Sequence, residues 1–257
     1  MILNESPRIE ILQGDCLEIL PTIPDKSIDL IAADLPYGTT QNLWDSVIDL
    51  EKLWIQYKRI IKNSGAIILT AQTPFDKVLG CSNLEWLKYE LIWEKSKATG
   101  FLNAKKIPLK AHENVLVFYK EQPIYNPQLT KGKPYDKGWI KAQNGKGTYG
   151  EFAARFSLNT TGDRLPRSVI YFKTAESEGE LIHPTQKPVH LFEYIIRTYS
   201  NEGDTVLDNC MGGGGATGIA SFFTNRNFIG IEKEQTYFDK AADRIKNVIS
   251  TPKFNLV

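Results

Sequence analysis

Short apolar runs alternate along this chain with stretches whose apolar residues recur at helical spacing. The run at residues 28–33 contains one polar residue, Asp29, which is typical of a strand buried on both faces. Strands of that kind belong to parallel sheets that carry helices on each side. The alternation therefore predicts an α/β fold.

The predicted elements cover both ends of the chain but not its middle. Strands are expected at residues 8–12, 28–33, 66–70, 89–93, 114–119, 205–207 and 228–231. Helices are expected at 49–61, 188–199, 217–223 and 237–249, and Asn63-Ser64-Gly65 is expected to end the first of them. Together these elements predict seven mostly parallel strands with helices on both faces. Residues 121–180 lack periodicity, which predicts an insertion between two parts of one domain, 1–120 and 181–257.

The composition excludes several classes of protein. Of the 257 residues 42% are hydrophobic and 24% are charged, which excludes a disordered chain. The formal net charge is +1, so any surface for nucleic acid must be local. Cys16, Cys81 and Cys210 form no CxxC or Cys/His cluster, so we expect buried or neutral thiols and no metal site. Without a long apolar run or a signal-peptide pattern, a soluble cytoplasmic protein is expected.

A glycine turn lies between the predicted strand at 205–207 and the next helix. Gly212 and Gly214 allow the backbone to approach a ligand closely, and the helix N-terminus offers free N–H groups. Glu232 ends the following strand, where a carboxylate suits the two hydroxyls of a ribose. This order favours a nucleoside-containing cofactor over a ligand-free turn. The spacing of Gly212, Gly214 and Gly218 does not match GxGxxG, which disfavours a dinucleotide.

Asp34-Leu35-Pro36-Tyr37 follows directly after the buried strand at 28–33. Ligands of open α/β sheets bind at the carboxyl ends of strands, so these residues are expected in a site. Asp34 and the Leu35 carbonyl suit the two hydrogens of an amino group, and Tyr37 suits stacking on a flat heterocycle. Pro36 keeps Leu35 extended, which aims that carbonyl. An ordinary proline-containing loop is the alternative.

Three segments together resemble a known family. Asp34-Leu35-Pro36-Tyr37 resembles the Asp-Pro-Pro-Tyr motif of S-adenosylmethionine-dependent amino-methyltransferases, and residues 208–216 resemble their cofactor loop. His183-Pro184-Thr185-Gln186-Lys187-Pro188 resembles the segment that precedes that loop. The order of the motifs resembles the β group of DNA adenine-N6 methyltransferases. The resemblance implies a Rossmann-like fold with circularly permuted motifs and S-adenosylmethionine as cofactor.

The resemblance also implies roles for particular residues. Asp34, Leu35, Pro36 and Tyr37 would hold the target base. The residues that would bind the cofactor are Asp15 with neighbouring Cys16 at its adenine, Glu232 at its ribose, and Thr185, Gln186, Lys187, Asp208, Cys210, Gly212 and Gly214 around its methionine part. His183 is interpreted more simply as a helix-entry or core histidine.

A local basic surface is expected between Lys131 and Lys173, because this segment contains nine basic residues and only three acidic ones. Aromatic residues, Tyr135, Trp139, Tyr149 and Phe152, are interleaved with them. This mixture fits contacts to duplex DNA, with a solvated loop as the alternative. The candidate DNA-binding residues are Lys133, Lys137, Lys141, Arg155, Arg164 and Arg167. A second basic stretch, residues 95–110, is a candidate for a loop that closes over a flipped base.

The resulting hypothesis is an enzyme that methylates N6 of a flipped-out adenine in double-stranded DNA, of prokaryotic or phage origin. Methylation of cytosine N4 or of RNA is an alternative, although the cytosine-N4 members resemble Ser-Pro-Pro-Tyr and this chain has Asp34. A non-catalytic DNA-binding subunit is a further alternative, which the intact acids disfavour. Relatives of the β group often dimerise, so a homodimer is an expectation.

Overall fold

A computed structural model of the chain describes residues 1–38, 46–142, 150–179, 181–182 and 185–251. The chain divides into two compact units, one formed by Met1–Asn126 with Ser168–Val257 and one formed by Pro127–Arg167. Among the described residues, no helix is long and apolar enough to cross a membrane.

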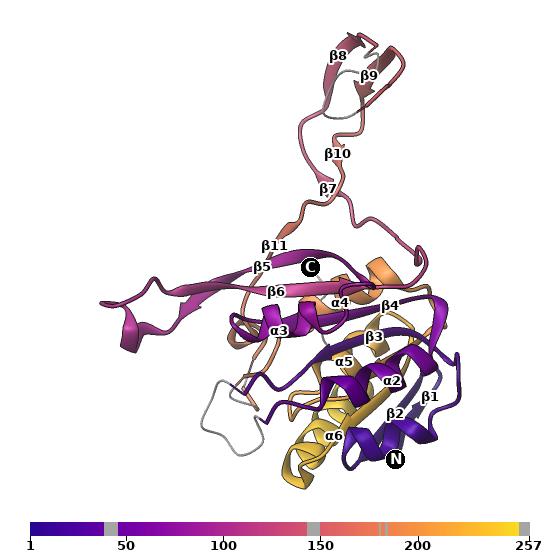
Figure 1. Cartoon of the computed structure of the whole chain (residues 1–257), viewed down its shortest axis with the longest axis vertical. Coiled ribbons are helices and arrows are strands. Elements are labelled where there is room, and N and C mark those ends of the chain that lie inside the picture. Colours follow the sequence, from indigo (N-terminus) through magenta and orange to yellow (C-terminus); the bar gives the residue numbers. More distant parts are fainter. Residues whose placement is uncertain (39–45, 143–149, 180, 183–184, 252–257) are drawn as a thin grey trace. The chain divides into compact units, whose positions relative to one another are not determined.

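The first unit is built around one large sheet (Figure 1). In spatial order its described strands are β1 (Ile2–Glu5), β2 (Arg8–Gln13), β13 (Asn227–Glu232), β12 (Thr205–Asp208), β3 (Ile28–Asp34), β4 (Ile61–Ala71), β6 (Lys110–Phe118), β5 (Leu87–Thr99) and β11 (Val169–Phe172). The strands from β2 to β4 run parallel, and β6 is antiparallel to both β4 and β5. The predicted fold class is confirmed, and all seven predicted strands are present.

Two strands at the edges were not predicted. β1 pairs antiparallel with β2, and β11 pairs parallel with β5. Each has only four residues, and β11 lies within the segment 121–180 that was predicted to be an insertion without periodicity. Because β11 belongs to the large sheet, the separate unit is narrower than the predicted insertion at 121–180.

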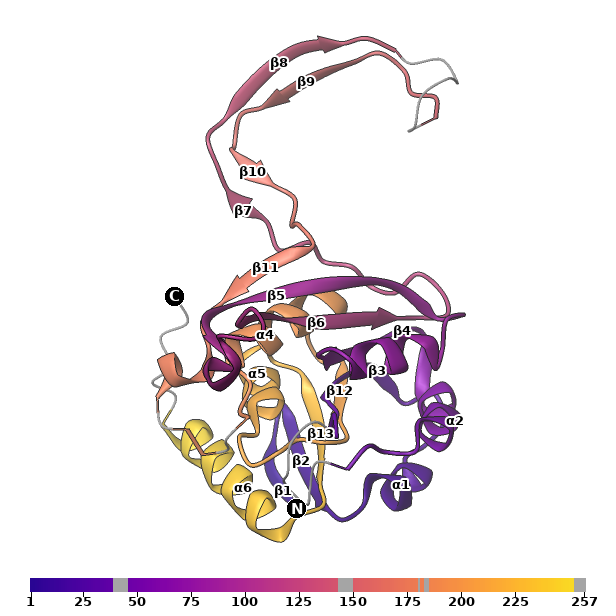
Figure 2. The same ribbon diagram turned by 60° about the vertical axis from the view of Figure 1, so that its left-hand side comes forward.

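Helices cover both faces of the sheet, as Figure 2 shows. α1 (Cys16–Ile19), α2 (Leu50–Ile60) and α3 (Phe75–Cys81) lie on one face, and α4 (Val189–Tyr199), α5 (Ala216–Phe223) and α6 (Gln235–Ser250) on the other. β3 serves both cores, because Leu30 and Ala32 pack with α4–α6 while Ile31 and Ala33 pack with α2 and α3. Side chains alternate between the faces of a strand, which explains its nearly continuous apolar sequence.

The end of α2 differs from the prediction. Asp49 caps the helix by accepting a hydrogen bond from the Lys52 N–H, but Ile61 enters β4 without an intervening loop. The segment Asn63-Ser64-Gly65 therefore lies inside a strand and does not terminate the helix. Gly65 is required there because a Cβ atom would lie 2.7 Å from the Asp29 carbonyl oxygen of neighbouring β3.

The described residues of the second unit form two small antiparallel pairs of strands. β7 (Thr130–Lys131) pairs with β10 (Asp163–Arg164), and β8 (Tyr135–Ile140) pairs with β9 (Arg155–Asn159). Short 3₁₀ turns complete the first unit at Leu20–Thr22, Phe101–Asn103 and Ala175–Glu178. The turn at Phe101–Asn103 lies at the tip of the β5–β6 hairpin, which projects from the sheet in Figure 1.

Candidate active site

Four acidic residues follow four neighbouring parallel strands. Asp15 lies just after β2, Glu232 ends β13, Asp208 ends β12 and Asp34 ends β3. The carboxyl ends of parallel strands lie at one edge of the sheet, so this strand order gathers residues that are far apart in sequence. A cavity of about 570 Å³ lies at this edge, which is within the usual range for small-molecule sites.

The cavity brings together every residue that the motifs assigned to the base and the cofactor. Its lining includes Asp15, Cys16, Asp34, Leu35, Pro36, Tyr37, Thr185, Gln186, Lys187, Asp208, Cys210, Gly212, Gly214 and Glu232. The predicted His183 and its neighbour Pro184 lie outside the described residues. The individual roles of the lining residues stay predictions.

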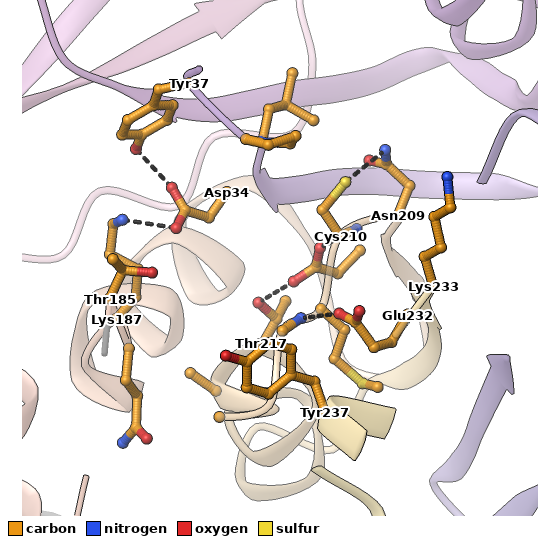
Figure 3. Close-up of a pocket in the computed structure, with 18 of the residues that line it drawn as sticks. Asp34, Tyr37, Thr185, Lys187, Asn209, Cys210, Thr217, Glu232, Lys233 and Tyr237 are labelled. Carbon is orange, nitrogen blue, oxygen red and sulfur yellow. Dashed lines mark hydrogen bonds and ion pairs between the residues drawn. The ribbon is translucent and has the colours of Figure 1, made fainter. Parts of the chain in front are cut away.

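Asp34 lies at the centre of a cluster of polar side chains (Figure 3). Its Oδ1 atom accepts hydrogen bonds from the hydroxyls of Tyr37 at 2.6 Å and Thr70 at 2.5 Å. Its Oδ2 atom accepts a hydrogen bond from Lys187 Nζ at 2.6 Å. Thr70 pairs in register with Asp34 across β3 and β4, which explains why its hydroxyl reaches this carboxylate.

The contact of Lys187 with Asp34 was not predicted, since the motif suggested a place near the cofactor's methionine part. The Lys187 side chain is only 8% exposed, and its Nζ atom also lies 3.3 Å from Glu113 Oε2. Burial alone would lower the pKa of this ammonium, but the charges of Asp34 and Glu113 raise it above its usual value. Lys187 is therefore a buried cation held between two carboxylates.

Glu113 and Lys95 belong to the same cluster and were missed as site residues. Lys95 Nζ lies 2.9 Å from Glu113 Oε1, and both side chains are buried. Burial alone would raise the pKa of Glu113, but Lys187 and Lys95 lower it below its usual value. One signal in the sequence could have identified them: Lys95 and Glu113 are charged residues that flank the apolar runs at 89–93 and 114–119, which predict buried strands.

The other end of the cavity holds carboxylates that contact backbone groups. Glu232 accepts hydrogen bonds from the N–H groups of Gly212 at 2.9 Å and Glu234 at 2.8 Å. Burial nevertheless raises the pKa of Glu232. Asp15 caps α1 by accepting from the Leu17 N–H at 2.9 Å, and it pairs with the exposed Lys233 at 3.1 Å.

Asp208 is the most deeply buried of the four acids. It accepts hydrogen bonds from the Cys210 N–H at 3.0 Å and the Thr217 hydroxyl at 2.7 Å. Burial raises its pKa from 3.8 to about 7, although both hydrogen bonds act in the opposite direction. Asp208 therefore links the end of β12 to the first turn of α5.

The glycine turn packs closely against its neighbours. A Cβ atom at Gly214 would lie 2.8 Å from the Gln186 side chain, and one at Gly213 would lie 2.8 Å from the Tyr237 ring. Arg244 donates a hydrogen bond to the Gly214 carbonyl. Side chains in this turn would therefore displace Gln186 or Tyr237, both of which line the cavity.

The thiols divide between buried and exposed positions. Cys16 is buried and Cys210 is half-buried, and both line the cavity, where Cys210 Sγ accepts a hydrogen bond from Asn209 Nδ2 at 3.4 Å. Cys81 is exposed at the end of α3. In the part of the chain that the structure describes, no group of His, Cys, Asp and Glu is arranged to hold a metal ion.

Most of the predicted DNA-binding residues are exposed in the second unit, namely Lys133, Lys137, Lys141, Arg155 and Arg167. Arg164 differs from them. Its guanidinium donates hydrogen bonds to the carbonyls of Lys133, Gly162 and Asp163 and lies over the Tyr135 ring. These contacts indicate that Arg164 stabilises the β7–β10 region. Lys146 and Tyr149 of the predicted basic surface lie outside the described residues.

The fold and the cavity define a Rossmann-like α/β protein with a site suited to a nucleoside-containing ligand. The chain belongs to the N6_N4_Mtase family of DNA methylases, which matches residues 28–243. It is 30% identical to the type II methyltransferase M.HinfI of Haemophilus influenzae, over 94% of this chain and 69% of that protein. It is also 30% identical to the DNA adenine methyltransferase YhdJ of Escherichia coli (strain K12), over 91% of this chain and 82% of that protein.

Solved structures show the same fold. The M1.HpyAVI–SAM complex is 24% identical with a TM-score of 0.63, over 92% of this chain and 98% of that chain. The cytosine-N4-specific PvuII DNA methyltransferase is 16% identical with a TM-score of 0.62, over 93% of this chain and 91% of that chain. The family resemblance drawn from the motifs is confirmed, and the protein is a DNA methyltransferase.

Proposed function

We propose that this protein transfers a methyl group from S-adenosylmethionine to N6 of an adenine in duplex DNA. The observation that carries the proposal is the position of Asp34, whose carboxylate faces the same cavity as the acids at the glycine turn. An amino group bound to Asp34 would thus lie near a cofactor held by that turn. The adenine methyltransferase YhdJ among the relatives supports adenine as the base.

The residues at the glycine turn fit S-adenosylmethionine. Glu232 keeps acceptor capacity beyond its two backbone hydrogen bonds, which suits the ribose hydroxyls, and Asp15 suits the amino group of the cofactor's adenine. The Gln186 Nε2 atom is buried in the cavity wall without a hydrogen-bond partner among the described residues. A buried donor of this kind is costly unless it is paired, and the carboxylate of the cofactor's methionine part would pair it.

Asp34 and the Leu35 carbonyl would bind the target amino group by accepting its two N–H bonds. The lone pair of this nitrogen is delocalised into the ring, so acceptors for both hydrogens favour the pyramidal, more nucleophilic form. The cofactor supplies a methyl group bound to a positively charged sulfur. Transfer would form a new N–C bond and break the C–S bond, with the electron pair of that bond left on sulfur. Asp34 would be the nearest acceptor for the N–H proton that the amino group then loses.

A base inside a duplex cannot reach this cavity, so the target adenine must leave the helix. Extrusion costs about a few kcal/mol, which stacking on Tyr37 would partly offset. The exposed basic residues of the second unit and the tip of the β5–β6 hairpin are the proposed DNA contacts. The hairpin tip carries Lys97, Lys105, Lys106 and Lys110 without an acidic residue between them, and its Phe101 and Leu102 are 77% and 84% exposed.

Transfer of tritium from labelled S-adenosylmethionine to duplex DNA, single-stranded DNA and RNA tests the proposal. We expect duplex DNA to be the preferred acceptor and N6-methyladenine to be the product on nucleoside analysis. A predominance of N4-methylcytosine or of labelled RNA would refute it. Methylation-sensitive sequencing of DNA from an expressing host would then define the recognition sequence.

Salt dependence tests the contribution of the second unit. Lys133→Gln and Lys137→Gln should weaken binding to all duplexes equally and lower the slope of log K against log salt by about one unit for each phosphate that is no longer neutralised. Lys52→Gln on α2 is the matched control, because it removes an exposed lysine of the first unit. Unchanged slopes in all three variants would favour the hairpin tip as the main contact.

The bacterial sources of the named relatives support a place of action on bacterial DNA in the cytoplasm. A homodimer is part of the same proposal. Sedimentation equilibrium on the purified protein would decide this point, and a mass equal to one chain at micromolar concentration would refute the dimer.

A further inference from the structure

Lys187 contacts the two groups that an incoming base would use, namely the Asp34 carboxylate and the Tyr37 ring. Its Nζ atom lies 2.6 Å from Asp34 Oδ2, where an N–H of the target amino group would bind. The same atom lies 5.4 Å from the centroid of the Tyr37 ring, as a cation over an aromatic ring, and Phe75 already stacks on that ring at 5.5 Å. The ammonium and the base therefore compete for the same contacts.

Lys187 cannot simply lose its partner when a base arrives. Its side chain is almost fully buried, and an unpaired buried charge is far more costly than an exposed one. Glu113 Oε2 already lies 3.3 Å from Nζ, so a second carboxylate is within reach of a small movement. The ammonium can thus leave Asp34 without leaving the cavity.

Glu113 is fixed in the position that this movement needs. Lys95 holds its other oxygen at 2.9 Å, and the Glu113 backbone pairs in register with Trp93 across β5 and β6. Two carboxylates and two ammonium groups make the cluster neutral. Its net charge stays the same whether Lys187 pairs with Asp34 or with Glu113, so the exchange does not require a change of net charge in a buried region.

We propose that Lys187 holds the place of the target amino group in the DNA-free protein, and that Glu113 is a positioning residue that receives the ammonium when the base enters. This inference rests on the proposed function, because it concerns the same base site. Glu113 Oε2 also accepts a long hydrogen bond of 3.4 Å from the Tyr37 hydroxyl, but its proposed action is through Lys187, and it takes no part in the transfer of the methyl group. Asp34 then has a free oxygen for the amino group.

Glu113→Gln tests the proposal because it keeps the shape of the side chain and removes the charge that would receive Lys187. Entry of the base is followed with a duplex that contains the recognition site defined by sequencing. 2-Aminopurine is placed beside the target adenine, and the fluorescence of this probe rises when the adenine leaves the stack. We expect the variant to bind this duplex in the flipped state about tenfold more weakly, which corresponds to Lys187 remaining on Asp34 in about nine of ten molecules. Calorimetry with S-adenosylhomocysteine should show an affinity within about twofold of the parent protein.

Removal of the lysine in the same background is the decisive measurement. Lys187→Met keeps a chain of similar length without the ammonium, so its base entry should equal or exceed that of the parent. If Glu113 acts by receiving Lys187, then Lys187→Met should restore base entry in the Glu113→Gln protein. A merely structural role for Glu113 would leave the double variant as defective as Glu113→Gln.

Glu94→Gln is the matched control, since Glu94 lies on the same hairpin but is exposed. Base entry in this variant should be unchanged.

Should Glu113→Gln fail to fold, as judged by circular dichroism, Lys187→Met alone tests the proposal. A loss of base entry in that variant would contradict the competition between Lys187 and the base for Asp34. A parent protein that methylates no adenine in duplex DNA would overturn the proposed function itself. Normal base entry in a folded Glu113→Gln protein of an active enzyme would overturn only this inference.

Discussion

The carboxylates at the two ends of the cavity have different kinds of partner. At the base end, Asp34 and Glu113 are paired with the buried ammonium groups of Lys187 and Lys95. At the cofactor end, Glu232 and Asp208 accept hydrogen bonds from backbone N–H groups and from the Thr217 hydroxyl. Within the described ranges of the chain, no basic side chain forms an ion pair with either of these two acids.

This difference separates an end that exchanges partners from an end that is built in advance. A lysine side chain has rotatable bonds and can move from one carboxylate to another, whereas backbone donors are fixed by the turn and the strand that contain them. The cofactor end should therefore bind its ligand with little rearrangement. The base end should bind only when Lys187 is displaced.

The largest expected effect comes from removing the acceptor at the base end. Asp34→Asn should lower the rate of methyl transfer by about 10³-fold, because the amide presents a donor where an acceptor of the amino hydrogens is needed. Binding of S-adenosylhomocysteine should remain near that of the parent. A tritium-transfer assay and calorimetry measure the two quantities, and near-normal turnover would remove Asp34 from the mechanism.

The next effect concerns the cofactor end. Glu232→Ala should weaken S-adenosylmethionine binding by about 1.5–3 kcal/mol, since the variant cannot form charge-assisted hydrogen bonds to the ribose. Glu234→Ala removes an exposed neighbouring carboxylate and should change the affinity little. Equal affinities in both variants, measured by calorimetry, would mean that the ribose binds elsewhere.

A smaller effect is expected on stability at the same end. Because burial raises the pKa of Asp208 from 3.8 to about 7, the folded protein retains a proton that the unfolded chain has released. The free energy of unfolding should therefore fall as the pH rises from about 4 to 7 through this group, and stay level above that range. Asp208→Asn removes this dependence and should raise the Tm by about 5 °C at pH 8, with less change at pH 4.

Scanning calorimetry at the two pH values measures this effect. The exposed Asp243→Asn variant on α6 is the control for a change of net charge. An increase in Tm of the same size at pH 4 and pH 8 would show that Asp208 is ionised throughout.

The smallest effect is expected from the exposed ion pair at the cofactor end. Lys233 is mostly exposed, and its contact with Asp15 at 3.1 Å is screened by solvent. Lys233→Met should change cofactor affinity by less than about threefold, and added salt should reduce even that difference. A decrease in cofactor affinity as large as that of Glu232→Ala would show that a lysine side chain is also important at the cofactor end. The two ends would then no longer differ in their use of a basic side chain.

Much of the fold and of the cofactor end was predictable because its signals are local. The apolar run at 28–33 predicted β3, and helical spacing predicted α2 and α4 to within a few residues. Gly212, Gly214 and Glu232 lie close together in the sequence as strand, turn, helix and strand. Such a unit places its own acid and its own glycines at the same edge of the sheet.

The base end was only partly predictable because its partners come from three separate elements: Glu113 from β6, Lys95 from β5 and Lys187 from the segment before α4. β6 runs antiparallel to β4, so the beginning of β6, and not its end, lies at the edge where Asp34 is found. This direction brings Glu113 to the site. Glu113 pairs in register with Trp93 on β5, so Lys95, two residues after Trp93, lies close enough to form an ion pair with Glu113. No local pattern in the sequence encodes the direction of a strand relative to a neighbour.

The sequence by itself determined the alternation of strands and helices, the acids at the ends of the parallel strands, and the family to which the motifs belong. The tertiary structure alone decided that Lys187 pairs with Asp34, and that Arg164 binds backbone carbonyls within its own unit. The physical reason is that hydrophobic periodicity is a property of neighbouring residues. The pairing of a buried charge depends instead on which strands and loops are brought together when the chain folds.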